Sequence, residues 1–179
     1  SRRAVAAIFL AATGCADERG ADGGSWPSIP LAEERASVMT FNVENLFDAE
    51  HDPGKEDWTF LPLAKKTGPE HAARCGRLAS EFHREQCLRW DWSESVLKIK
   101  LERIAAAILQ GGRGPDIAVL QEVENLAVLE RLRRGPLAAA GYRAPIFIEG
   151  GDPRGIDAAI LSRFEPAGEP RLRELPGGR

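Results

Sequence analysis

One short stretch, PDIAVLQEVEN at residues 115–125, constrains the fold more than any other part of the chain. A Gly-Pro turn precedes a continuous apolar run, residues 117–120, which is typical of a strand buried on both faces of a sheet. The run ends on Gln121 and Glu122, where an apolar core would otherwise continue. A buried carboxylate needs a cation or hydrogen bonds to stay ionised, so Glu122 is a candidate metal ligand. The alternative is a solvated glutamate at a strand exit.

A second β-favouring stretch, SVMTFNVENLFD at residues 37–48, ends in the same way. Its polar end contains Asn42 and Glu44. Ligands of open α/β sheets gather at the carboxyl ends of strands, so the two polar ends are expected to converge. Together they would supply two or three oxygen ligands, which Mg²⁺ or Ca²⁺ prefers and Zn²⁺ does not.

Residues 91–112 form the clearest predicted helix. Asp91 and Glu94 have the spacing of a capping box, and Gly111 and Gly112 end the pattern. Apolar residues recur at the helical period along one face: Leu97, Leu101, Ile104, Ala105, Ile108 and Leu109. Charged residues that we expect to be solvated occupy the opposite face: Lys98, Lys100, Glu102 and Arg103. A helix between these two strands predicts a right-handed parallel crossover.

The chain after residue 124 predicts one more helix and two more strands. Asn125 is expected to cap a helix over residues 126–134, which Gly135 and Pro136 end. Residues 142–149 and 156–161 are expected to be strands, the second with Asp157 at its head.

Three blocks in order, TFNVENLFD, LQEVEN and DPRGIDAAILS (residues 152–162), resemble the endonuclease/exonuclease/phosphatase superfamily, which has the deoxyribonuclease I-like fold. The resemblance implies an α/β fold of mixed β-sheets flanked by helices. It also implies hydrolysis of a phosphodiester by a water activated by Mg²⁺ (or Mn²⁺ or Ca²⁺), with nucleic acid as substrate and an endonuclease as the leading activity. A net charge of −3 argues against tight coating of DNA but not against a metal-dependent nuclease.

The resemblance also assigns roles to individual residues. Glu122 matches the main metal-binding glutamate of the family, and Asn42 matches the asparagine that orders the metal site and the phosphate. Glu44 is a weaker match to a further metal ligand. We expect Arg154 to contact a phosphate and Asp157 to order the site as a catalytic residue; an exposed salt bridge in a turn is the alternative for both.

The family motifs that follow the third block have no counterpart here. These motifs are a general-base histidine, an Asp-x-Asn motif and a Ser-Asp-His motif. The histidines of this chain, His51, His71 and His83, all precede the third block and so cannot match them. Residues 35–179 are therefore expected to be the N-terminal part of the domain, with its C-terminal half missing. Such a part should leave sheet edges and an apolar face uncovered, and by itself should bind metal weakly if at all and hydrolyse nothing.

The N-terminal segment has the layout of an export signal. Residues 1–15 combine two arginines, a short apolar run and small residues before Cys15, as in a signal peptide with a bacterial lipobox. Lipidation of Cys15 would anchor the protein to a membrane, and an amphipathic helix with a chance cysteine is the alternative. Residues 16–34 are expected to be a disordered linker. We expect a periplasmic or membrane-anchored lipoprotein, or a secreted protein, with no obligate protein partner.

Residues 49–92 are an insertion relative to a minimal domain of this family. In an exported protein its two cysteines, Cys75 and Cys87, are expected to form a disulfide, worth about 3 kcal/mol in the chain-entropy model. A metal site with His71 and His83 is the alternative.

Two other functions stay open. The tryptophans of the insertion and the possible membrane anchor favour a lipid-directed phosphoesterase of the sphingomyelinase or phosphoinositide type. The absence of the later motifs favours a non-catalytic envelope lipoprotein.

Overall fold

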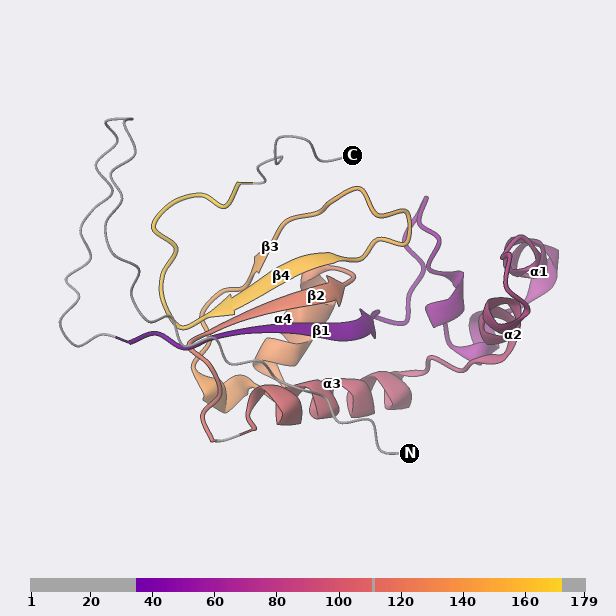
Figure 1. Ribbon diagram of the computed structural model, residues 1–179. Coiled ribbons are helices and arrows are strands. Elements are labelled where there is room, and N and C mark those ends of the chain that lie inside the picture. Colours follow the sequence, from indigo (N-terminus) through magenta and orange to yellow (C-terminus); the bar gives the residue numbers. More distant parts are fainter. Residues whose placement is uncertain (1–34, 111, 172–179) are drawn as a thin grey trace.

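The computed structural model describes residues 35–110 and 112–171 (Figure 1). Over these residues the chain forms a mixed α/β fold, in which helices flank one four-stranded sheet. This agrees with the α/β class expected from the sequence. The expected signal peptide, the lipidation of Cys15 and the expected linker lie outside the described residues. No helix in the described ranges is long and apolar enough to cross a membrane.

The sheet has the order β1-β2-β4-β3, with a parallel pair at one side and antiparallel pairs at the other. Its strands are β1 (Val38–Leu46), β2 (Ile117–Val123), β3 (Ile146–Phe147) and β4 (Asp157–Ser162). The parallel pairing of β1 with β2 and the strand headed by Asp157 confirm two sequence predictions.

The strand predicted over residues 142–149 is mostly absent, because only Ile146–Phe147 pairs with β4. Pro145 has no amide hydrogen and interrupts the ladder just before this pair. Tyr142, at the start of the predicted strand, instead buries its ring and donates from its hydroxyl to the Pro115 carbonyl, at 2.8 Å.

One face of the sheet is buried and the other is only partly covered. Ala118, Leu120 and Val123 of β2 are fully buried, whereas the alternating Ile117 and Val119 are partly exposed. Burial of this strand on both faces was therefore too strong a prediction. Val38 pairs with Ile117 and is 52% exposed, so this second face is partly open to solvent.

Helix α3 (Glu94–Ile108) connects β1 to β2 across the buried face and confirms the main predicted helix. Its apolar residues enter the core as the periodicity indicates: Leu97, Leu101, Ile104, Ala105 and Ile108. The capping box was wrong, because Ser93 is the N-cap residue. Asp91 instead accepts a hydrogen bond from the Leu63 amide at 2.8 Å, which ties the helix start to the insertion.

Helix α4 (Leu126–Arg134) begins as predicted. The side chain of Asn125 accepts a hydrogen bond from the Val128 amide at 2.9 Å. Val128, Leu129 and Leu132 are fully buried, while Leu126 is 48% exposed. The buried stripe of α4 therefore runs through Val128, Leu129 and Leu132 and leaves out Leu126.

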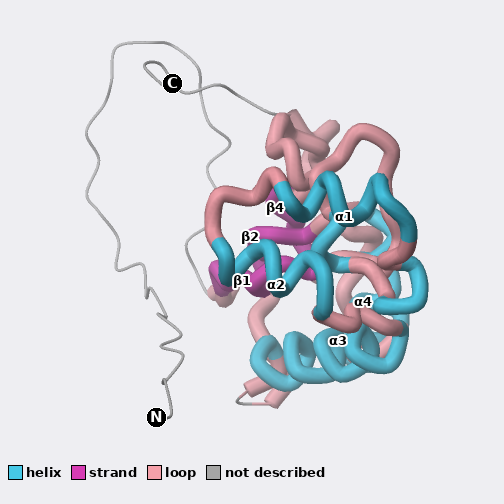
Figure 2. The backbone as a smooth tube through the Cα atoms, turned by 90° about the vertical axis from the view of Figure 1, so that its right-hand side faces the viewer, coloured by secondary structure: helices cyan, strands magenta, loops and turns pink. Residues whose placement is uncertain are grey.

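The insertion lies beyond the carboxyl ends of β1 and β2 (Figures 1 and 2). It contains two short 3-10 helices (Trp58–Phe60 and Leu63–Lys65) and two α-helices, α1 (Gly68–Gly76) and α2 (Glu81–Arg89). Aromatic packing fixes its base: Phe47 stacks on Phe60, and the Trp92 indole donates to the Phe47 carbonyl at 3.1 Å. The insertion is thereby held next to the strand ends that carry the candidate site.

Candidate functional site

The ends of β1 and β2 have unusual backbone conformations. Between Asn42 and Leu46 the register of β1 with β2 shifts, and β2 has a matching irregularity at Glu122. Glu44, Asn45 and Glu122 have φ values of 55°, 63° and 65°. Non-glycine residues seldom adopt this left-handed conformation, and such residues cluster at functional sites. Bulges of this kind also redirect side chains at the ends of strands.

These two irregular strand ends contact each other directly. The Asn45 amide donates to Glu122 Oε2 at 3.0 Å, and the Glu44 amide donates to Asn42 Oδ1 at 2.7 Å. The bond from Asn45 to Glu122 joins the two strand ends that carry Asn42, Glu44 and Glu122, whereas the bond between Glu44 and Asn42 lies within β1 and involves only the backbone of Glu44. Asn45 joins them through its backbone, although the sequence analysis did not single it out. Asparagine tolerates the left-handed conformation better than most residues, which is the local signal that was overlooked.

Lys100 also belongs to this group, contrary to its predicted place on a solvated face. Its ammonium donates to the Glu44 carbonyl at 2.7 Å, and the side chain is partly buried. Burial lowers the pKa of Lys100, while the carboxylates of Glu44 and Glu122 act in the opposite direction. The periodicity of α3 identified its core face correctly but could not show that β1 ends beside Lys100.

The residues predicted on the third block lie on and before the neighbouring strand β4. Asp157 pairs with Val123, next to Glu122, and its Oδ2 is buried without a hydrogen-bond partner among the described residues. Arg154 is engaged by Asp152, with Nε–Oδ1 at 3.1 Å and Nη2–Oδ2 at 3.0 Å. For Arg154 this is the turn salt bridge named as the alternative. The bond to Asp152 raises the pKa of Arg154, and Glu122 adds a smaller contribution.

A second group of carboxylates, centred on Glu124, lies beside the first and was missed by the sequence analysis. Glu124 is 4% exposed; its Oε2 accepts from the Asp48 amide at 2.7 Å. Its Oε1 is buried without a hydrogen-bond partner in the described ranges. Burial raises the pKa of Glu124 to about 9, and the nearby carboxylates of Asp48, Asp52 and Asp57 add to this rise. A signal was present, because Val-Glu-Asn occurs at both strand ends.

Asp57 is the most deeply buried carboxylate of this second group. It is fully buried, and one carboxylate oxygen contacts His51 Nδ1 while the other accepts from the Asp52 amide at 2.7 Å. Burial raises the pKa of Asp57, against the effect of these hydrogen bonds. His51 is therefore committed to Asp57.

The potential metal donors at the ends of β1 and β2 are oxygen atoms. They are the carboxylates of Glu122 and Glu44 and the amide oxygen of Asn42, with no compact set of three carboxylate, histidine or cysteine ligands among the described residues there. Mg²⁺ is commonly held by one or two carboxylates and keeps several waters or substrate oxygens. Ca²⁺ would need more protein oxygens, and Zn²⁺ would need nitrogen or sulfur ligands. The donors at these strand ends are therefore oxygen atoms, the type of ligand atom that Mg²⁺ and Ca²⁺ take.

The predicted disulfide between Cys75 and Cys87 is confirmed, and it joins α1 to α2 with a Cα–Cα distance of 5.6 Å. His71 lies against this disulfide, whereas His83 is exposed on α2 beside Phe82. A metal site that includes His83 is therefore excluded in this arrangement.

Comparison of the chain with protein-family models, with curated proteins and with solved structures finds no match to any of them. The residues and contacts described above are therefore the basis for the proposed function.

Proposed function

We propose that this protein is an exported, metal-dependent phosphodiesterase of the endonuclease/exonuclease/phosphatase superfamily, with nucleic acid as its substrate. The observation that supports it most is the hydrogen bond between the two left-handed strand ends, from the Asn45 amide to Glu122; Asn42 and Glu44 lie on the same strand end as Asn45. The resemblance of the sequence blocks to the superfamily assigns the metal to Glu122. The deoxyribonuclease I-like form of the sheet is part of the same proposal.

Within this proposal Glu122 is the principal ligand of Mg²⁺, and Asn42 and Glu44 complete the protein's share of the ligands. When bound, Mg²⁺ supplies Lewis-acid polarisation of a phosphoryl oxygen and stabilises developing negative charge. The Asn45 amide holds one oxygen of Glu122 in place, which leaves the other oxygen for the metal.

The cationic side chains next to the carboxylates contribute to phosphate binding in this proposal. Lys100 is held at the strand end by the Glu44 carbonyl, so its charge lies close to any phosphate bound near Glu122. Arg154 would have to leave Asp152 to bind a phosphate, because its guanidinium makes two bonds to that carboxylate. Asp157, next to Glu122 across the sheet, orders this edge of the site.

The lipid-directed alternative receives little support from the insertion. Trp92 is buried in the core and Trp58 packs against His51 and Arg74, so these rings serve packing. Trp90 is the one tryptophan of the insertion that is largely exposed, at 47%. The non-catalytic alternative retains one supporting observation: among the described residues, no histidine is recorded in contact with Glu122.

A substrate panel under controlled metal conditions tests the proposal. The natural full-length protein, and not residues 35–179 alone, would be assayed with supercoiled plasmid, RNA, and choline- and inositol-headgroup lipids, each with Mg²⁺ and with EDTA. We expect nicking of nucleic acid that requires Mg²⁺ and falls by roughly a hundredfold or more in Glu122→Gln. Glu102→Gln, an exposed glutamate on α3, is the matched control. Lipid hydrolysis without nicking would select the lipid alternative, and indifference of activity and melting to EDTA would select the non-catalytic one.

A further inference from the structure

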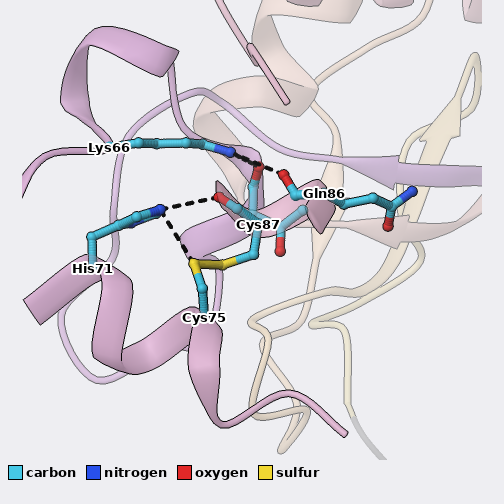
Figure 3. The surroundings of a disulfide bond; sticks show 6 residues. Lys66, His71, Cys75, Gln86 and Cys87 are labelled. Carbon is cyan, nitrogen blue, oxygen red and sulfur yellow. Dashed lines mark hydrogen bonds between the residues drawn. A yellow bond between two sulfur atoms is a disulfide. The ribbon is translucent and has the colours of Figure 1, made fainter. Parts of the chain in front are cut away.

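The insertion contains a compact group of three potential metal ligands, separate from the Glu122 site. His71 and Cys75 come from α1 and Cys87 comes from α2. Their ligand atoms all lie within 4.8 Å of one another, and all three residues are buried. Figure 3 shows the imidazole directed at the sulfur atoms between the two helices.

Helix periodicity explains why His71 faces the sulfur atoms. His71 and Cys75 are four residues apart in α1 and project from the same face. His71 Nε2 lies 3.2 Å from Cys75 Sγ and 3.0 Å from the Cys87 carbonyl, to which it donates. His71 is only 4% exposed, and its Nδ1 has no hydrogen-bond partner in the part of the chain that the structure describes. A metal bound at Nε2 would leave Nδ1 unpaired as well, so the closeness of the three ligand atoms, and not this nitrogen, is the observation that points to a metal.

We propose that His71, Cys75 and Cys87 bind one Zn²⁺ ion when the disulfide between the two cysteines is reduced. Thiolate and imidazole ligands are those that Zn²⁺ prefers. Two thiolates also cancel the charge of the ion, so the buried complex carries no net charge. The group offers three protein ligands, and water or another small ligand fills the fourth position of the tetrahedron.

A phosphine can reduce the disulfide in a balanced reaction. The phosphine gives two electrons to the S–S bond and becomes its oxide with oxygen from water, while each sulfur gains a proton. Binding of Zn²⁺ then displaces the two thiol protons. His71 binds as a neutral imidazole through Nε2, after its proton moves to Nδ1 and the bond to the Cys87 carbonyl is released.

The two cysteine side chains need to move only a little to bind zinc. Two Zn–S bonds of about 2.3 Å at a tetrahedral angle place the sulfurs roughly 3.8 Å apart. The Cα atoms of Cys75 and Cys87 are already 5.6 Å apart, so rotation of the two side chains can open this gap. The zinc proposal does not depend on the hydrolase function, because Glu122 and the residues around it take no part in zinc binding.

Zinc titration of the reduced protein tests the proposal. The full chain would be reduced with a phosphine, freed of reductant without oxygen, and titrated with Zn²⁺ against a chromogenic chelator. We expect one Zn²⁺ per chain in the reduced form and none in the disulfide form. Substituted Co²⁺ should show thiolate charge-transfer absorption.

Two variants separate the site from adventitious binding. His71→Asn keeps both cysteines but should lower zinc affinity by at least roughly tenfold, whereas His83→Asn, on exposed α2 surface, should bind as the parent does. Circular dichroism of the oxidised His71→Asn protein checks that the variant is folded. The proposal is overturned if the reduced parent takes up less than one equivalent, folded or not, or if His71→Asn binds zinc as tightly as the parent.

Discussion

Replacement of Glu124 with glutamine should remove a pH-dependent loss of stability. The parent side chain is buried and keeps its proton until a pKa of about 9, whereas an unfolded glutamate ionises near its ordinary value. The folded state therefore binds this proton more tightly than the unfolded state. The stabilising effect is complete below about pH 4.5 and is lost progressively as the pH rises toward about 9.

The size of the effect follows from the linkage relation. Each pH unit between these limits costs the parent at most about 1.4 kcal/mol, so the loss between pH 5 and pH 7 is at most about 3 kcal/mol. Glutamine cannot ionise and has no such slope. It preserves the shape of Glu124 and an oxygen for the Asp48 amide, so cavity formation does not confound the comparison.

Urea unfolding at pH 5 and pH 7, in EDTA, measures this difference. Between pH 5 and pH 7 the free energy of unfolding should fall by about 1 to 3 kcal/mol more in the parent than in Glu124→Gln. Glu102→Gln, which changes an exposed glutamate, should follow the parent. An unchanged pH slope in Glu124→Gln would refute the assignment of a buried, protonated carboxyl at this position.

Two further substitutions test the supports of the fold. The double change Cys75→Ser and Cys87→Ser should lower the free energy of unfolding by about 3 kcal/mol without reductant, and a drop well under 1 kcal/mol would show that the bond constrains little. Asn125→Ala should cost about 1 kcal/mol in the same urea assay, because the Val128 amide loses its capping acceptor. An unchanged midpoint for Asn125→Ala would mean that water replaces the cap.

Features encoded by neighbouring residues could be predicted from the sequence. The apolar run before Gln121, the Asn125 cap and the spacing of Leu97 and Leu101 are local patterns, and the structure contains the elements they indicate. The disulfide followed from cysteine count and the expected compartment. The parallel pairing of β1 with β2 followed from two strands that end in the same kind of residue and are joined through a helix.

Features that depend on which elements meet could not be predicted in this way. Lys100 lies on the polar side of its helix, and only the course of β1 brings Glu44 to it. Glu124 follows a strand end that looks polar, yet its side chain is buried, with Asp52 and Asp57 of the insertion near enough to influence its charge. Asp91 has the spacing of a cap but accepts from a residue of the insertion. Each outcome reflects a tertiary contact that overrides a local preference.

The most direct test of the metal site is a titration of the isotope-labelled chain with paramagnetic Mn²⁺, followed by amide resonances in NMR spectra. The account predicts that signals of residues 42–45 and 121–123 broaden first, that Mg²⁺ reverses the broadening, and that Glu122→Gln abolishes it. First broadening around Asp48 and Glu124, or broadening that survives in Glu122→Gln, would contradict the claim that Glu122 holds the metal.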